Sequence, residues 1–466
     1  MSKDVEAYPS KLFFVSMLTR DIDLRDAVLD LLDNCIDGVL RQLSRENLES
    51  DKPYSGYYAR INASPNGFSI KDNCGGIPKE IARSSAFRLG RPDLERDKDI
   101  PTVGMYGIGM KRSLFKMGKH SFVISQHDNS AYTVEIPPDW LTDDTDWKLD
   151  ISDIPDRFDE DGTEIIVNLL YPSISSQFDA GRHSFLDDLY QDISFFFALI
   201  IAKGFIVYLN DKVVVPVPLG ILAPKDVETS DIKPYLYKAV INEVHVSLAV
   251  GFYRELARDS EIEDENQIPR KSDNAGWTII CNDRVILHRD KSKKTGWGIR
   301  NVPQFHTQFI AISGIVIFRS ENSLNLPVNT TKRGLDTSSE IYWHVLEHMM
   351  TGMKKFTDFT NHWKGREEET TKWFKQMDTV DTVKFLDELP EIRWVSVPHS
   401  AGTEHRNTVT LPRPPENNRK RRISFLRDRQ EVELMALYFF SDPKADTAAI
   451  GNRCFDLALE QMEAEA

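Results

Sequence analysis

The sequence has little cysteine: four residues in 466, with no Cys-x-x-Cys pair among them. Cys35, Cys74, Cys281 and Cys454 stand far apart. Zinc sites and disulfide frameworks built from cysteine are typically marked by characteristic spacings, so this scatter argues against both.

A long apolar run is also missing. The longest, residues 195–202 followed by 205–209, is interrupted by Lys203 and Gly204 and is too short to span a bilayer. No basic, apolar, small-residue signal opens the chain. We therefore expect a protein without a membrane segment and with a cytoplasmic location.

Positive charge is in the minority, with 58 Lys and Arg against 72 Asp and Glu and a net charge of −14. Such a molecule repels nucleic acid as a whole, so any contact needs a local basic patch. One basic cluster predicts at most a weak, salt-sensitive binding of nucleic acid. The alternative is that this cluster belongs to a solvated linker. The members of the cluster are Arg413, Arg419, Lys420, Arg421, Arg422, Arg427 and Arg429.

The composition is that of a globular protein with several domains, since 41% of the residues are hydrophobic and 28% charged. Residues 21–43 carry apolar side chains at helical spacing, and alternating strand patterns follow at 58–62 and 68–71, with turn residues at 65–67 between them. They predict an α/β sandwich, a mixed sheet layered with helices, over residues 1–170. Beyond it we expect an α/β domain over 171–340, with one of its strands over 277–288, then a helical region over 341–398, a linker over 399–422 and a helical module over 423–466.

Four oxygen-bearing residues share one face of the first helix. Asp30, Asp33, Asn34 and Asp37 are spaced i, i+3, i+4 and i+7, without Lys or Arg among them. Like charges at this spacing repel, and Mg²⁺ would offset the repulsion. The pattern indicates either a site for a hard cation and a water molecule, or a solvated acidic face.

Two glycine-containing segments follow. A strand over 68–72 ends at Asp72, whose carboxylate could accept a hydrogen bond from an adenine amino group; an ordinary Asp-Asn-Gly turn is the alternative. Residues 104–113 run glycine-rich into a helix, a pattern typical of phosphate binding. The GK[ST] ending of a Walker motif is absent.

In this order, the segments resemble the GHKL ATPase superfamily, whose Bergerat fold is shared by gyrase, the large heat-shock chaperones, histidine kinases and MutL. The family motif E-L-x-x-N-x-x-D-A corresponds to residues 30–38, D-x-G-x-G to 72–76 and G-x-x-G-x-G-x-K to 104–111. A fourth motif, Gly-Thr at a strand start, corresponds to 162–163.

The resemblance implies ATP and Mg²⁺ as cofactors. Asp30 would be the general base, Asn34 the Mg²⁺ ligand and Asp72 the adenine reader. Asp30 replaces the family's glutamate and is one methylene shorter, which predicts slow turnover. Cys74 replaces a family glycine. The other nucleotide contacts implied are Asp37, Gly76, Ile77, Gly104, Tyr106, Gly107, Ile108, Gly109, Lys111 and Thr163, with a lid over 88–110.

The second region extends the resemblance. Residues 276–286 are similar to the transducer turn and strand of MORC-type ATPases. Residues 325–333 are similar to a chaperone stretch in which a cation reaches the γ-phosphate. Lys332 holds that position, with Arg333 beside it; a basic surface turn is the alternative.

The resemblance is nearest to MORC-like and heat-shock-chaperone-like standalone ATPases. It implies a slow, Mg-dependent ATPase that acts as an ATP-gated clamp on a protein or nucleic-acid partner. A homodimer, constitutive or ATP-driven, is expected. A nucleotide-sensing scaffold with negligible hydrolysis is the alternative. The apolar run over 432–440 predicts a small C-terminal core or a partner surface.

Overall fold

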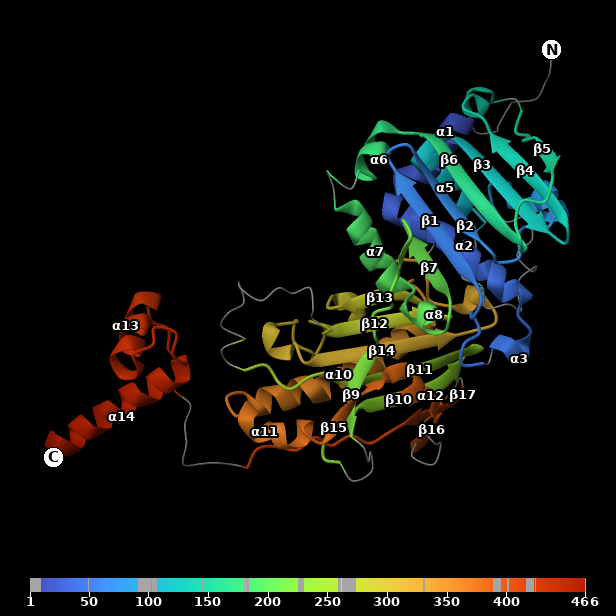
Figure 1. Ribbon diagram of the computed structural model, residues 1–466. Helices are drawn as coiled ribbons and strands as arrows, with labels where there is room; N and C mark the ends of the chain where they lie inside the picture. The colour runs from blue at the N-terminus through green and yellow to red at the C-terminus, as the bar shows by residue number, and fades with distance from the viewer. Residues whose placement is uncertain are drawn as a thin grey trace, which may run out of the picture.

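Two β-sheets with their helices form the body of the protein, and a pair of helices lies apart from them (Figure 1). The pair, α13 (Arg429–Phe440) and α14 (Thr447–Glu465), lies within the predicted C-terminal module. No helix in the described part of the chain combines the length and apolar character needed to cross a membrane. The computed structural model describes residues 10–48, 50–90, 102, 107–144, 146–179, 181, 184–224, 230–258, 261, 274–329, 332–388, 395–399, 402–415, 423 and 425–465.

The first sheet has eight strands in the order β5-β4-β3-β6-β2-β1-β7-β8. Neighbouring strands are antiparallel except β1 and β7, which run parallel. This mixed sheet with its helices confirms the predicted α/β fold. The strands are β1 (Tyr58–Ser64), β2 (Gly67–Asp72), β3 (Gly118–His127), β4 (Ser130–Ile136), β5 (Ile151–Ile154), β6 (Gly162–Leu170), β7 (Ile206–Leu209) and β8 (Lys212–Val213).

This sheet continues beyond residue 170, the predicted end of the first domain. β7 pairs with β1 from Tyr58↔Ile206 to Ile61↔Leu209. Parallel neighbours need a long crossover connection. The chain between β1 and β7 is long, and its last part consists of the helices α6 (Pro172–Gln177), α7 (Phe185–Phe196) and α8 (Ala198–Ala202), which lead from β6 to β7.

Helix α2 (Leu24–Gln42) packs on this sheet. Its side chains Val28 and Leu32 share one core with Ile61 and Ile70 of the sheet. Each fully buried side chain of this size contributes roughly 1.5–3 kcal/mol, which holds the helix firmly in place. The other helices of this part of the chain are α1 (Lys11–Arg20), α3 (Arg45–Leu48), α4 (Lys79–Ile81), the π-helix η1 (Ala82–Ala86) and α5 (Gly109–Met117), of which α5 packs beside α2.

The second sheet has seven strands in the order β13-β12-β14-β11-β10-β17-β16. Helix α10 (Glu340–Trp363) packs on one face, where Val246 and Leu248 of β11 join its core. Ala249 joins a separate core with Leu199 of α8. The strands are β10 (Tyr235–Ile241), β11 (Val244–Phe252), β12 (Gly276–Cys281), β13 (Arg284–Asp290), β14 (Ile312–Arg319), β16 (Val395–His399) and β17 (Gly402–Arg406).

Two expectations for this half are wrong. Strand β17 lies in the predicted linker, because it pairs through its backbone with β10 although its side chains do not alternate between apolar and polar. The predicted helical region also contains a strand, β15 (Met377–Asp381), between α11 (Glu367–Phe374) and α12 (Thr382–Glu388). β15 forms a separate two-stranded sheet with β9 (Gly220–Pro224).

Candidate functional site: the acidic face of α2

The carboxylates of α2 are buried. Asp30, Asp33 and Asp37 are 4%, 1% and 2% exposed, whereas Asn34, on the same helix, is exposed. The alternative of a solvated acidic face is therefore wrong. Buried carboxylates are costly unless charged or hydrogen-bonding partners meet them.

Arg112 of α5 meets Asp30. Its Nε donates to Asp30 Oδ2 at 2.8 Å, and its Nη2 donates to the same oxygen. The other carboxylate oxygen, Oδ1, lies 4.0 Å from Lys332 Nζ. Arg112 thus holds one oxygen of Asp30 and leaves the second facing a lysine.

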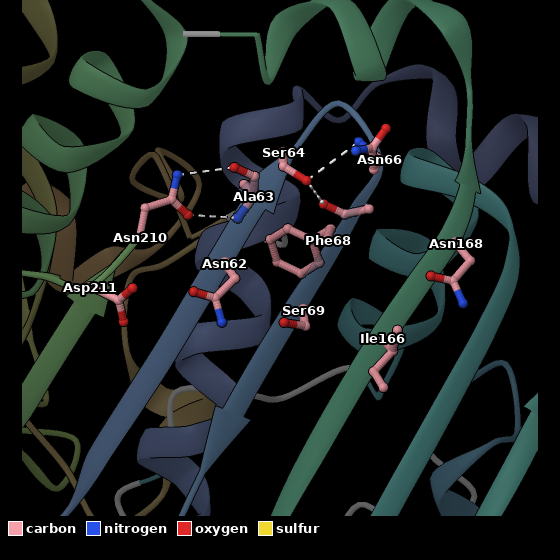
Figure 2. Close-up of a pocket in the computed structure, with 11 residues that line it drawn as sticks. Asn62, Ala63, Ser64, Asn66, Phe68, Ser69, Ile166, Asn168, Asn210 and Asp211 are labelled. Carbon is pink, nitrogen blue, oxygen red and sulfur yellow. Dashed lines mark hydrogen bonds between the residues drawn. The ribbon is translucent and has the colours of Figure 1, made fainter.

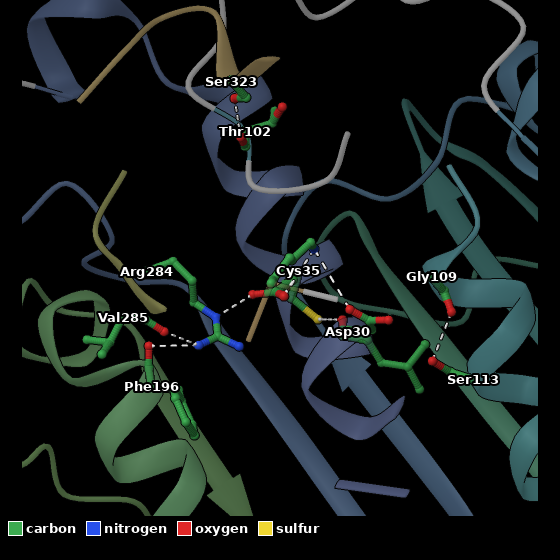
Figure 3. A network of polar contacts seen from close by, with 12 residues as sticks. Asp30, Cys35, Thr102, Gly109, Ser113, Phe196, Arg284, Val285 and Ser323 are labelled. Atoms are coloured by element: carbon green, nitrogen blue, oxygen red, sulfur yellow. Dashed lines mark hydrogen bonds and ion pairs between the residues drawn. The ribbon is translucent and has the colours of Figure 1, made fainter. Parts of the chain in front are cut away.

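Asp33 receives two cations from the second half of the chain. Arg284 Nε donates to its Oδ1 at 2.8 Å, and Lys332 Nζ to its Oδ2 at 3.1 Å. Arg284 reaches in from the second sheet and also donates to the carbonyls of Phe196 and Val285 (Figure 3). A buried charge pair with this many additional bonds is well satisfied.

Lys332 is 7% exposed, so the alternative of a basic surface turn is wrong. Its neighbour Arg333 pairs with Asp26 at the start of α2 and, at 3.1 Å, with Asp192 of α7. Both cations of this segment therefore contact the helices of the first half.

Charges across this site shift the pKa values in different directions. Burial raises the pKa of Asp30 by more than Lys332 and Arg112 lower it. For Asp33 burial also opposes ionisation, but Arg284 and Lys332 hold its pKa below the usual value. Burial opposes the charge of Lys332, yet Asp33, Asp30 and Asp37 raise its pKa.

The N-terminus of α5 lies against this acidic face. A Cβ added to Gly109, the first residue of α5, would stand 3.5 Å from Asp30 Oδ2. Ile108 immediately precedes the helix, and Gly107 has φ +65°, which favours glycine. Helix N-termini attract anions, so this junction is suited to phosphate. Gly104 and Tyr106 lie outside the described residues.

Lys111 is buried in the first turn of α5. Its Nζ donates to the carbonyl of Ala86 at 2.9 Å and to that of Gly107. Burial lowers its pKa to about 8. In this arrangement the ammonium bonds backbone oxygens beside the predicted phosphate site.

Asp72 ends β2 as a buried carboxylate. Its Oδ1 accepts from the backbone N–H groups of Cys74, at 2.8 Å, and Thr163, at 3.3 Å. Its Oδ2 accepts from the Cys35 thiol of α2 at 3.4 Å. Burial raises the pKa of Asp72 to about 6, against the opposing effect of these donors.

Close backbone contact brings the predicted adenine residues together. A Cβ on Gly162 would lie 2.1 Å from the Asp72 carbonyl oxygen, so only glycine lets β6 start here. Gly76 follows in the turn with φ +66°. Ile77 N–H donates to Ser125 Oγ at 2.7 Å, which ties the end of this turn to β3.

A separate open groove of about 490 Å³ lies on the sheet (Figure 2). Asn62, Ser69 and Asn168 line it, and they occupy strand positions that alternate with core residues such as Ile61 and Ile70. Side chains alternate between faces along a strand. The groove is therefore on the face opposite α2 and is not part of the acidic site.

Sequence reasoning missed three members of the site: Arg112, Arg284 and Cys35. Arg112 lies three residues after Gly109 in α5, so the two residues share one face of this helix. A contact between Gly109 and α2 would therefore have predicted that Arg112 also faces α2. Arg284 carries no such local signal, because Asp33 is 251 residues away.

Residues 22–161 match the family described as histidine kinase-, DNA gyrase B- and HSP90-like ATPase. The match spans α2, the Asp72 turn and the start of α5, and it ends one residue before Gly162. No curated protein matches the chain.

Proposed function

Because residues 22–161 belong to the histidine kinase-, DNA gyrase B- and HSP90-like ATPase family, we propose that this protein binds Mg-ATP and hydrolyses it slowly. The observation that carries the proposal is the meeting of α5 and α2, with Gly109 against Asp30. The N-terminus of α5 faces the carboxylates of α2, which form ion pairs with Arg112, Arg284 and Lys332. Phosphate and metal chemistry both need such a mixed site.

The residues present fit a nucleotide. Asp72 is a buried acceptor at one end, suited to an adenine amino group. The α5 N-terminus with Lys111 is suited to the phosphates. Asn34, exposed one turn beyond Asp30, would hold Mg²⁺. The bound ion would supply charge neutralisation and polarise the γ-phosphate.

Asp30 is suited to accept a proton from water. Arg112 fixes Oδ2, so Oδ1 is the oxygen left to act as the base. Burial raises the Asp30 pKa, which makes the carboxylate a stronger base. Its short side chain limits its reach, and we therefore infer slow turnover.

The clamp action rests on Lys332. This residue comes from the segment between β14 and α10 and touches two carboxylates of α2. A γ-phosphate beside Asp30 would compete for the same ammonium. Nucleotide state would then change how the two halves of the chain are joined, as in MORC-like and chaperone-like ATPases. The protein or nucleic-acid partner of such a clamp stays a prediction.

A nucleic-acid partner gains no support from the basic cluster. Arg427 lies 4.0 Å from Glu431, and Arg429 lies 2.9 Å from Glu433, so acidic neighbours meet both. Arg419, Lys420, Arg421 and Arg422 lie outside the described residues.

A nucleotide sensor without hydrolysis is the second candidate. The bond pair between Arg112 and Asp30 favours it, because a base engaged by arginine takes up a proton less readily. Hydrolysis and binding must therefore be measured separately.

The rate of phosphate release from ATP in the presence of Mg²⁺ tests whether the protein is an ATPase. It is measured for the wild type, Asp30→Asn and Asn34→Ala. Loss of a general base slows proton transfer by about 10²–10⁴-fold, so Asp30→Asn should retain at most a hundredth of the rate. Asn34→Ala should raise the Mg²⁺ requirement. Glu46→Gln, an exposed carboxylate on α3, is the matched control and should keep the full rate.

Binding of a fluorescent ATP analogue tests the site itself. Asp72→Ala should weaken binding by roughly tenfold or more, as expected for losing a hydrogen bond to a charged group. Unchanged binding would refute the adenine assignment. Wild-type release equal to that of Asp30→Asn, with binding intact, would establish the sensor instead.

A further inference from the structure

Two histidines and a glutamate converge on the second sheet, away from α2. His344 and His348 stand one turn apart on α10, and Glu404 lies on β17. Their ligand atoms all lie within 4.8 Å of one another. His344 Nε2 is 2.6 Å from Glu404 Oε1, and His348 Nε2 is 3.6 Å from Glu404 Oε2.

The distances suit a single small cation. A tetrahedral Zn²⁺ has bonds of about 2.0–2.2 Å to nitrogen and oxygen, which places its ligand atoms about 3.3–3.6 Å apart. The His348–Glu404 separation of 3.6 Å matches this distance, and the shorter His344–Glu404 separation of 2.6 Å, which involves the other carboxylate oxygen, would lengthen when a metal binds. The i, i+4 spacing points both imidazoles to one side of α10, toward the sheet.

Tyrosines of β10 hold the histidines in place. Tyr237 OH lies 3.1 Å from His344 Nε2, and its ring stacks on His348 with centroids 3.8 Å apart. Tyr235 OH lies 3.3 Å from His348 Nδ1. Partners on the second ring nitrogen orient metal-binding histidines, and Tyr235 has that position.

We propose that His344, His348 and Glu404 form a site for a divalent transition metal, with Zn²⁺ as the best match. Two imidazoles and one carboxylate are a common zinc ligand set, and water would fill the fourth position. Mg²⁺ is a poor match, because it prefers oxygen ligands in octahedral geometry. The site is thus chemically distinct from the proposed Mg-ATP site.

The spacing His344-Val-Leu-Glu347-His348 is also that of the inverted zinc-peptidase motif, in which the glutamate activates water. Here Glu347 is exposed and pairs with Arg300 at 2.6 Å. We therefore assign metal binding and not peptide hydrolysis.

A metal here would join α10 to β17, which lies between β10 and the edge strand β16. β17 pairs with β10 over only three residue pairs, from Tyr237↔Arg406 to Ala239↔Glu404. Glu404 is 8% exposed, so its charge is matched by the imidazoles or by a bound cation. Zn²⁺ would satisfy this charge and fix the strand on the sheet.

Cobalt titration of the full, chelator-treated chain tests the site, because tetrahedral Co²⁺ absorbs visible light strongly whereas hydrated Co²⁺ absorbs weakly. We expect one equivalent to give the tetrahedral spectrum and one equivalent of Zn²⁺ to remove it. His348→Ala and Glu404→Gln should weaken binding at least about 100-fold. His362→Ala, an exposed histidine on the same helix, should bind like the wild type.

The melting temperature in chelator identifies variants that fail to fold. A variant that melts like the metal-free wild type but takes up no Co²⁺ supports the site. Absence of a tetrahedral spectrum in the wild type, or an equal spectrum in Glu404→Gln and His348→Ala, would overturn it. The readout is independent of ATP, so it also holds if the proposed ATPase function is wrong.

Discussion

At the scale of single residues, the charge state of Asp72 can be tested by changing the pH, because its pKa is close to neutrality. Burial raises its pKa to about 6, above the value near 3.9 of the unfolded chain. The fold therefore favours the protonated carboxyl, and its stability contribution falls as pH rises from about 4 to 6. An adenine amino group needs the opposite, ionised form as its acceptor.

Adenosine binding should consequently weaken in acid. A carboxylate with a pKa of about 6 is mostly protonated at pH 5, so we expect affinity about tenfold lower at pH 5 than at pH 8. Adenosine carries no phosphates, which removes their titration from the measurement. Calorimetry across this range checks the prediction, and a flat profile would contradict the role of Asp72.

The sequence predicted the carboxylates of the site and one of their cations, Lys332, but not Arg112 or Arg284. Helical spacing is a local property, and it predicted one shared face for Asp30, Asp33, Asn34 and Asp37. The three carboxylates are buried, whereas Asn34 is exposed. Arg284 is 251 residues from Asp33, and Lys332 is 299 residues away. Such pairs depend on how the two sheets pack. The resemblance of residues 325–333 to the chaperone stretch predicted a role for Lys332. Arg284 lies in the segment 276–286, which resembles the transducer domain, but no role was predicted for it.

At the scale of elements, the hairpin of β12 and β13 joins the two halves. Its turn, Asn282-Asp283, has positive φ at both positions, as tight hairpins require. Asp283 accepts from Tyr54 OH at 3.2 Å and from Lys203 Nζ at 2.7 Å. The next residue, Arg284, donates to Asp33. Asp283 and Arg284 together therefore contact three separate segments of the first half of the chain.

This hairpin also could not be predicted from the sequence alone. Residues 277–288 were expected to form one strand, because apolar residues continue on both sides of the polar pair. The chain instead reverses at Asn282-Asp283, and β12 pairs with β13. In the first sheet, by contrast, the predicted strands at 58–62 and 68–71 correspond to β1 and β2, since clear turn residues separate them.

Arg284→Met should destabilise the folded chain by about 3 kcal/mol, because it leaves a buried carboxylate short of one partner. Urea unfolding checks this value. Arg300→Met is the matched control: its pair with Glu347 is exposed on both sides and should contribute less than about 1 kcal/mol. Equal losses in the two variants would show that the Arg284 pair adds no more than a surface contact. Adding Asp33→Asn to Arg284→Met should recover part of the loss.

At the scale of the whole molecule, self-association must overcome charge. Each copy carries −14, and two copies repel over a distance that salt shortens from about 14 Å at 50 mM to about 6 Å at 300 mM. Apolar contact must supply the attraction. Helix α1 offers it, since Leu12, Phe13 and Met17 are all exposed.

We therefore expect a non-hydrolysable ATP analogue with Mg²⁺ to produce dimers in sedimentation experiments, and more of them at 300 mM than at 50 mM salt. Phe13→Ser should abolish the dimer, because it removes part of the apolar face of α1. Trp343→Ser, which removes an equally exposed aromatic residue from α10, should leave it unchanged. Dimers that weaken with salt, or that persist in Phe13→Ser, would mean that ion pairs or another surface drive assembly. Dimers that form without nucleotide would uncouple association from ATP.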